Sequence, residues 1–145
     1  KRRKEKTMNY KIIAKYIKNL NFGIADPKAF FLIEKNISKY KINIDIKSNQ
    51  FKQKLVEVET TLALNSEEKL DKEINTKITY STILELDGDI SDKKKLEEII
   101  LIKVPTEIYP EIRNIFIYLF EKCGFKKIKI EEKVNFKNLY LSRKN

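Results

Sequence analysis

The sequence predicts an α+β fold in which a four-stranded antiparallel sheet is covered by one long C-terminal helix. Two patterns carry this prediction. Apolar and polar residues alternate in four segments, residues 10–22, 40–47, 55–64 and 74–86, which are joined by short links as antiparallel strands are. Apolar residues then recur three and four positions apart through residues 108–123, which is the pattern of one broad face of a helix of about four turns.

Residues 10–22 are compatible with two kinds of structure. Apolar residues at most even positions indicate a strand, whereas Ile13, Ile17 and Leu20 also fit one face of a helix. The many β-branched and aromatic residues favour the strand. The Ala-Asp-Pro sequence at 25–27 then ends the element, because these residues are typical of turns and breaks.

The next three segments alternate more regularly. In residues 40–47 every even position is apolar and every odd position is polar, and residues 55–64 and 74–86 largely repeat this pattern. A polar turn is expected between them at residues 65–73. Each segment is therefore a strand with one buried and one solvated face, so the apolar face of the sheet needs a cover.

The C-terminal half of the chain supplies that cover. Ser91 is expected to cap a short helix, which Pro105 interrupts. The longer helix at 108–123 follows and stops at Gly124, because glycine readily adopts the left-handed conformation of a helix C-terminal cap. The chain is then expected to be extended and to close in a short helix at residues 135–144.

The composition excludes several kinds of active site. The chain has no histidine, which rules out histidine-based triads and histidine–metal sites. Its three glycines are isolated from one another, so no glycine-rich phosphate loop is present. An enzyme that relies on carboxylates or lysines alone remains possible, but no motif in the sequence marks one, and no catalytic or metal-binding residue is predicted.

The net charge of +10 is of the kind found in proteins that bind nucleic acids. However, the cations are 27 lysines and only four arginines, and they are mixed with 21 acidic residues along the whole chain. Dedicated nucleic-acid readers rely on arginine, whose planar group grips phosphates and base edges. Compositional drift is therefore favoured over a nucleic-acid partner.

The sequence also indicates where the protein works and how it is divided. No apolar run approaches the length of a membrane span, so no membrane insertion is expected. The single cysteine, Cys123, cannot form an internal disulfide, which points to a reducing compartment such as the cytoplasm or to indifference to the redox environment. Residues 1–8 are expected to form a basic disordered tail, and residues 9–145 a single domain.

The long helix carries more apolar surface than one sheet needs to cover. Ile117 points away from the main apolar face, and Tyr118 flanks it. Apolar residues on a second side of a helix indicate burial against another subunit, so these two residues are predicted to lie in an oligomer interface.

The order of these elements and several local motifs resemble the SecB family of bacterial protein-export chaperones. The resemblance extends from Tyr10 to Tyr140, and residues 14–22 match the first strand of the family. Its most specific parts are the Tyr-Pro-x-x-Arg unit at 109–113, the Gly-Phe pair at 124–125, and the Val-Asn-Phe sequence at 134–136 followed by Leu-Tyr at 139–140.

The resemblance implies an ATP-independent chaperone that binds unfolded preproteins and keeps them competent for export. Such a protein is not an enzyme and needs no cofactor. It also implies a homotetramer, built as a dimer of dimers, that passes its clients to a SecA-type motor. In this family the client-peptide groove is formed by the long helix and the extended segment after it. The corresponding residues here are Tyr109, Phe125, Ile128, Ile130, Val134 and Phe136.

The sequence departs from the family on the surface that docks the motor. SecB proteins are usually acidic, whereas this chain is basic, and Lys11, Lys15 and Lys18 on the first strand predict a positive local field. Peptide binding is therefore better supported than handover to SecA. The acidic docking positions correspond in this chain to Asn19, Gly23 and Lys77.

Two alternatives come from other functional classes. One is a subunit that keeps the SecB fold but serves as a structural or assembly part of a larger complex. The other is a basic nucleic-acid-associated protein, whose binding would weaken steeply with added salt. A fixed stoichiometric partner would indicate the first alternative, whereas a chaperone binds many unfolded clients.

Overall fold

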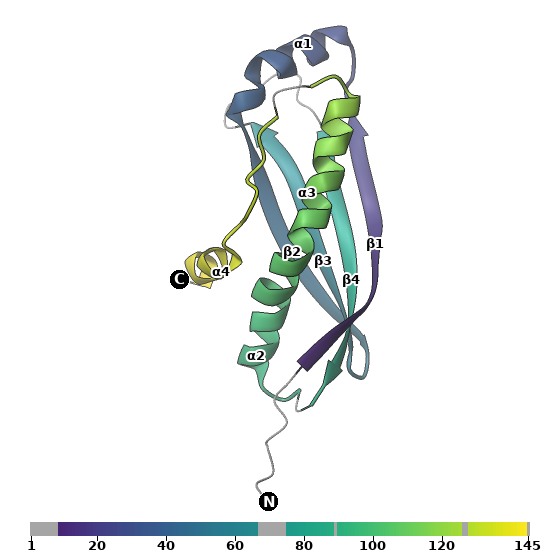
Figure 1. Cartoon of the computed structure of the whole chain (residues 1–145), viewed down its shortest axis with the longest axis vertical. Helices are drawn as coiled ribbons and strands as arrows, with labels where there is room; N and C mark the ends of the chain where they lie inside the picture. The colour runs from purple at the N-terminus through teal and green to yellow at the C-terminus, as the bar shows by residue number, and fades with distance from the viewer. Residues whose placement is uncertain (1–8, 67–74, 89, 126–127, 145) are drawn as a thin grey trace, which may run out of the picture.

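The computed structural model describes residues 9–66, 75–88, 90–125 and 128–144, which form a single antiparallel sheet with helices packed on one face (Figure 1). This arrangement confirms the predicted fold class. The strand order across the sheet is β1-β4-β3-β2, so β1 and β2 are the two edges. The strands are β1 (Asn9–Gly23), β2 (Tyr40–Lys52), β3 (Leu55–Ser66) and β4 (Asn75–Asp87).

Two of the sequence predictions fall wholly or largely on residues that the structure leaves undescribed. The basic tail at residues 1–8 lies outside the described residues. The predicted polar turn at 65–73 begins with two residues that belong to β3, and its remainder also lies outside them.

The first strand is a strand throughout, and two β-bulges explain its mixed sequence pattern. Its register against β4 shifts between Ile12 and Ala14 and again between Ile17 and Asn19. Each shift adds one residue, so the side chains that face the helices change parity along the strand. Apolar residues at both even and odd positions follow from this change rather than from a helical period.

A helix that the sequence analysis did not predict follows the first strand. The helix α1 (Pro27–Asn36) begins at Asp26, whose side chain accepts a hydrogen bond from the Ala29 amide at 2.8 Å. The Ala-Asp-Pro sequence therefore ends β1, as expected, and also starts a helix, because Pro27 suits the first helical turn. A short 3-10 helix, Ile37–Lys39, connects α1 to β2.

The predicted break between the short and the long C-terminal helices is wrong. The helix α2 (Lys93–Glu98) passes through a π-helical segment, Ile99–Lys103, into α3 (Val104–Lys122) without leaving helical geometry. Pro105 cannot donate a backbone hydrogen bond, so its effect is a locally widened turn rather than a stop. The predicted cap is also displaced by one residue, because Asp92 rather than Ser91 accepts the Lys95 amide.

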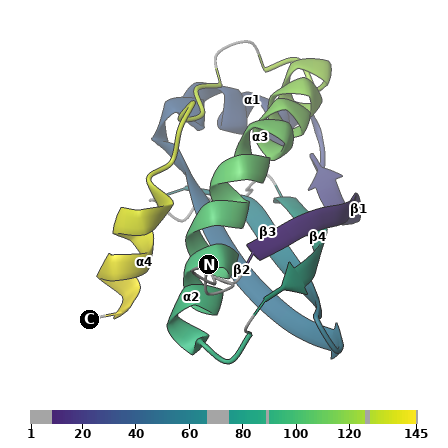
Figure 2. The same cartoon turned by 60° about the horizontal axis from the view of Figure 1, so that its bottom comes forward.

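The core lies between the sheet and the long helix, which runs diagonally across the sheet (Figures 1 and 2). The inner faces of the two central strands are fully buried, as the sequence alternation predicted. Helix α3 buries the face that its apolar spacing predicted, and the half-buried Cys123 follows at its C-terminal cap. The fully buried residues include Val58, Leu62, Ile78 and Leu84 of the sheet and Ile108, Ile112, Phe116 and Phe120 of α3.

Gly124 ends α3 in the way that the sequence predicted. Its φ of 93° is left-handed, its amide donates to the Glu121 carbonyl at 3.0 Å, and the Phe125 amide donates to the Phe120 carbonyl at 3.0 Å. These two bonds form a Schellman motif, and the Phe120 and Phe125 rings pack 5.8 Å apart beside it. The cap therefore also fixes where the chain leaves the helix.

Replacing Gly124 with alanine should destabilise the protein by about 1 kcal/mol, because an L-residue is strained at positive φ. The added methyl carbon would also lie 3.4 Å from the Phe30 ring. Gly23 is the matched control, because its φ is not left-handed and nothing lies within 4 Å of an added methyl carbon. Urea denaturation should show a lower stability for Gly124→Ala only; an equal loss in Gly23→Ala would contradict this account.

Candidate peptide-binding groove

An extended segment follows the Schellman motif and leads to the last helix, α4 (Phe136–Lys144). We call its described part, residues 128–135, the crossover segment. It runs beside the β2 side of the sheet (Figure 1). Ile130 is buried, and Ile128 and Val134 are half-buried, so the segment packs one row of apolar side chains against the body of the protein.

Two side chains of α3 hold the crossover segment in place. The Tyr109 hydroxyl donates a hydrogen bond to the Glu131 carbonyl at 2.6 Å, and Arg113 Nε donates one to the Ile130 carbonyl at 3.2 Å. Residues four apart lie one above the other on a helix, so both donors meet neighbouring carbonyls. This contact gives the Tyr-Pro-x-x-Arg unit a physical role. Burial raises the pKa of Tyr109, which keeps its hydroxyl protonated and able to donate.

The Val-Asn-Phe sequence has a similarly local explanation. Asn135 Oδ1 accepts a hydrogen bond from the Asn138 amide at 3.0 Å, which caps the first turn of α4. Phe136 is buried and packs edge-on against the Tyr109 ring at 6.0 Å. Val134 and Phe136 pack against the core on either side of Asn135 in the sequence, and so hold the capping residue in place.

Helix α4 is tied to two other elements. The Tyr140 hydroxyl donates to Glu97 Oε2 of α2 at 2.8 Å, and Arg143 Nη2 donates to the Ile44 carbonyl of β2 at 2.8 Å. The second bond reaches β2 at the edge of the sheet, where the outward backbone groups of a strand have no neighbouring strand to bond to.

A groove of about 420 Å³ lies between the edge of β2 and the crossover segment. Its wall is mainly apolar, and four of the six predicted groove residues contribute to it: Tyr109, Ile128, Ile130 and Val134. The sequence analysis missed the opposite wall, which comes from β2 and α4. That wall includes Tyr40, Ile42, Ile44, Leu139 and Arg143.

The other two predicted residues lie elsewhere. Phe136 lines a second cavity of about 200 Å³, and Leu139 and Arg143 line both cavities, so the two are neighbours across α4. Phe125 lines neither of them. It is buried, with its ring stacked on Phe30 at 4.9 Å, and so supports the turn that leads into the crossover segment.

The predicted motor-docking positions lie together at one end of the β1–β4 pair. Asn19 faces Thr79, Gly23 faces Asn75, and Lys77 pairs with Asn21. The structure thus brings the three positions onto neighbouring strands, on the edge of the sheet opposite the groove.

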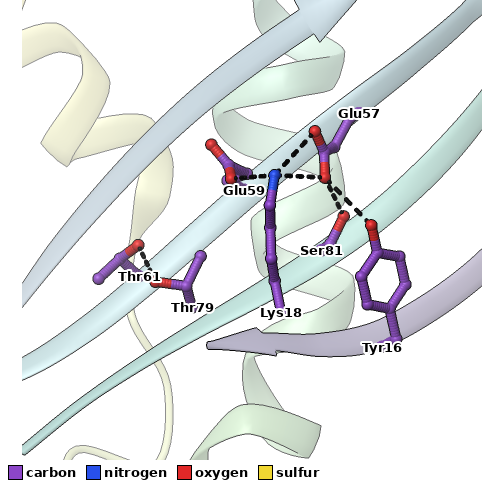
Figure 3. A network of polar contacts seen from close by, with 7 residues as sticks. All are labelled: Tyr16, Lys18, Glu57, Glu59, Thr61, Thr79 and Ser81. Carbon is purple, nitrogen blue, oxygen red and sulfur yellow. Dashed lines mark hydrogen bonds and ion pairs between the residues drawn. The ribbon is translucent and has the colours of Figure 1, made fainter. Parts of the chain in front are cut away.

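The positive field that the sequence analysis expected on β1 is offset at two of its three lysines, Lys15 and Lys18. Lys15 forms an ion pair with Glu111 of α3 at 2.6 Å, on the helix side of the sheet. Lys18 lies on the outer face, where it pairs with Glu57 at 3.1 Å and Glu59 at 2.6 Å (Figure 3). The bulges of β1 send the two lysines to opposite faces, so local carboxylates offset their charges.

Glu57 is the centre of this outer-face network (Figure 3). It accepts hydrogen bonds from Ser81 at 2.6 Å and Tyr16 at 3.3 Å in addition to Lys18. The Ser81 hydrogen bond, with those from Lys18 and Tyr16, holds the pKa of Glu57 below its ordinary value. The hydrogen bonds that Lys18 donates to Glu59 and Glu57 raise the pKa of Lys18. Lys18 and Glu57 therefore both stay charged near neutral pH.

The two predicted interface residues differ in exposure. Tyr118 is 58% exposed on α3, with Lys122 Nζ 5.5 Å from its ring centre. Ile117 is half-buried against the core of its own chain. Four large side chains of the edge strand β1 are also between 44% and 47% exposed: Ile13, Tyr16, Ile17 and Leu20. They do not share one face, because Tyr16 bonds to Glu57 on the outer face whereas Ile17 and Leu20 lie opposite Tyr80 and Ile78 of the inner face.

The candidate groove thus lies beside a sheet edge and is lined mainly by apolar side chains. Within the described ranges, no three cysteine, aspartate or glutamate side chains are grouped so as to hold a metal ion. In the same part of the chain, no helix is both long enough and apolar enough to cross a membrane.

The chain belongs to the SecB family, because the family model described as "Preprotein translocase subunit SecB" matches residues 3–145. It is therefore a protein-export chaperone of that family, whose members are not enzymes. A protein of Pelagibacter ubique (strain HTCC1062), described as a candidate protein-export protein SecB, is 40% identical over 139 residues. That match covers 96% of this chain and 99% of the relative.

A solved structure supports the fold. The SecB-like chaperone of Mycobacterium tuberculosis, in complex with a ChAD peptide from the HigA1 antitoxin, superposes with a TM-score of 0.53. The match covers 84% of this chain and 88% of that chain, at 12% sequence identity. At this identity the likeness concerns the fold alone.

The Glu57 network should make the free energy of unfolding decrease as the pH is lowered. A carboxyl whose folded-state pKa is lowered stabilises the protein above its unfolded-state pKa, near 4.3, and this contribution is lost as pH falls through the folded-state value. We expect Glu57→Gln to lose less stability than the unmodified protein between about pH 5 and pH 3. Ser81→Ala, which keeps the carboxylate but removes its shortest hydrogen bond, should fall between the two. The measurement is the free energy of unfolding by urea at each pH. The same pH dependence in all three proteins would contradict this expectation.

Proposed function

We propose that the protein is an ATP-independent chaperone that binds unfolded preproteins in the groove between β2 and the crossover segment and keeps them competent for export. The observation that carries this proposal is the groove itself, which is about 420 Å³ in volume and bounded by apolar side chains. The SecB-like chaperone of Mycobacterium tuberculosis was solved with a peptide, which agrees with this class of ligand.

The chemistry of the groove fits a broad class of unfolded clients. Burial of apolar surface contributes roughly 25 cal/mol per Å² and does not depend on direction, so many different segments can bind. The loss of chain entropy on binding offsets much of that gain. Affinity is therefore moderate for any one segment, and a protein that folds quickly hides its apolar side chains before it is captured.

Ile128→Ser should weaken client binding by roughly fivefold to tenfold, because it removes a half-buried apolar side chain from the groove. Ile24→Ser is the matched control, since Ile24 is also half-buried against the core but lies outside the groove. The measurement is how strongly each variant slows the refolding of a denatured preprotein without nucleotide. Light scattering first checks each variant for intact assembly.

Three results would contradict the proposal: equal losses in both variants, no slowing by the unmodified protein, or a need for ATP. Phe125→Ala provides a second comparison. Its ring is buried against Phe30 and Phe120, so its removal should cost about 3 to 5 kcal/mol of folding stability. A large loss of client binding at unchanged stability would instead place Phe125 in the groove directly.

We also propose that the protein assembles as a homotetramer in the cytoplasm. Exposed apolar side chains on the β1 edge and Tyr118 on α3 provide two surfaces on different elements, as a dimer of dimers requires. The mass of one chain is 17.2 kDa, so light scattering should report four times that value, and a mass near that of one chain would contradict the proposed assembly.

The charges on the surface of this chain give little support for handover to a SecA-type motor. Complementary charges speed encounter and exclude wrong partners. Here Asn19 and Gly23 are neutral and Lys77 is exposed and positive, in place of the family's acidic side chains.

The triple variant Asn19→Asp, Gly23→Glu, Lys77→Glu should bind a typical SecA more tightly than the unmodified protein, by about tenfold at low salt. Nothing lies within 4 Å of an added methyl carbon at Gly23, so the larger side chain can be accommodated there. Isothermal titration calorimetry measures the effect, with the motor of the same organism tested beside the typical one. Tight binding of the unmodified protein to a typical SecA would overturn the expectation.

A further inference from the structure

One wall of the groove is the edge of a strand rather than the face of a sheet. Five consecutive residues of β2, from Tyr40 to Ile44, line it. Side chains of successive strand residues point to opposite faces, so consecutive residues share one wall only along the strand edge. The strand order agrees, because β2 is the last strand of the sheet on this side.

The backbone of β2 presents polar groups to the groove. The Ile44 carbonyl accepts the Arg143 hydrogen bond, so it points away from β3 and out of the sheet. The amide and carbonyl of one strand residue point the same way, and the direction alternates along the strand. The amide and carbonyl of Ile42 therefore also point outward. They lie beside the apolar side chains that line the groove, which we call its floor.

The charged residues that line the groove are mostly basic. They are Lys41, Lys129 and Arg143, against a single acidic residue, Glu131. They come from three elements, namely β2, the crossover segment and α4, so basic residues belong to both walls of the groove. We call Lys41, Lys129 and Arg143 the rim of the groove. Arg143 uses Nη2 for its bond to Ile44, and a guanidinium group has further N–H groups to offer.

We propose that this groove selects extended client segments in which acidic residues flank the apolar ones. This inference rests on the proposed chaperone function and narrows its substrate class. Apolar side chains of the client enter the floor of the groove, where charge has no role. Aspartate or glutamate at neighbouring positions meets Lys41, Lys129 and Arg143 on the rim, whereas lysine or arginine there meets like charge.

Arg143 has a second part in this selection. Its bond to the Ile44 carbonyl covers a backbone acceptor at the open strand edge. A client strand that pairs with β2 takes over that acceptor through its own amide. The guanidinium is then released beside the client, where a carboxylate can accept two parallel hydrogen bonds from it. An acidic client thus compensates for the bond that its binding breaks.

The test uses three labelled peptides with one identical apolar core and flanking residues that are all glutamate, all glutamine or all lysine. Fluorescence anisotropy with the full chain should give the order glutamate, glutamine, lysine. The glutamate and lysine peptides should differ by about fivefold to tenfold in Kd at 0.05 M salt, since exposed ion pairs each contribute under about 1 kcal/mol. At 0.5 M salt the three values should converge.

Charge reversal identifies the residues responsible. Lys129→Glu with Arg143→Glu should invert the order of the peptides. Lys129→Glu alone, which keeps the bond between α4 and β2, should reduce the preference. Lys52→Glu with Lys93→Glu is the matched control, because it changes the net charge equally at exposed positions that do not line the groove. The control should keep the order of the unmodified protein.

The outcomes separate this inference from the proposed function. Equal binding of all three peptides, or an unchanged order in the reversed variants, would overturn the charge selection and leave the chaperone function standing. An inversion in the control pair as well would assign the preference to the net charge of +10 and overturn the role of the rim. No binding of any peptide, the neutral one included, would overturn both.

Discussion

Two neighbouring backbone carbonyls of the crossover segment accept hydrogen bonds from one face of α3. The segment runs beside the sheet without joining it, so Glu131 and Ile130 receive their bonds from Tyr109 and Arg113. Both hydrogen bonds are partly shielded from water, and together they fix the segment against the helix. The groove exists because the segment is held at that position, and α4 starts where the segment ends.

The sequence predicts those elements of the fold in which apolar residues recur at one constant spacing. Strict alternation predicts β2, β3 and β4, because each keeps one face buried. It is ambiguous for β1, because the bulged residues Ile13 and Lys18 shift the period twice. It misses α1, which buries only Ala29 and Ile33 and so shows little apolar pattern. Pro105 misleads because a π-helical turn can accommodate it.

The candidate groove is predictable only on the side that local motifs encode. Ile128, Ile130 and Val134 alternate along the crossover segment and line the groove as expected. The other wall depends on a contact between Arg143 and Ile44, which are 99 residues apart, and no local pattern indicates it. Phe125 is an aromatic residue of the kind that could line a groove, and was predicted to do so. Its ring instead stacks on Phe30 of α1, the helix that the sequence analysis missed.

The π-helical segment between α2 and α3 sets the phase of the two helices relative to each other. A residue added to one helical turn rotates the turns before it by about 100° with respect to the turns after it. Ile99 and Ile100 at the start and Ile108 and Ile112 beyond it are all buried against the same sheet with this rotation in place. The number of residues in this region is therefore constrained by angle. A one-residue deletion would shorten the helix by only about 1.5 Å yet rotate Leu96 of α2, which packs half-buried against the core, away from the sheet.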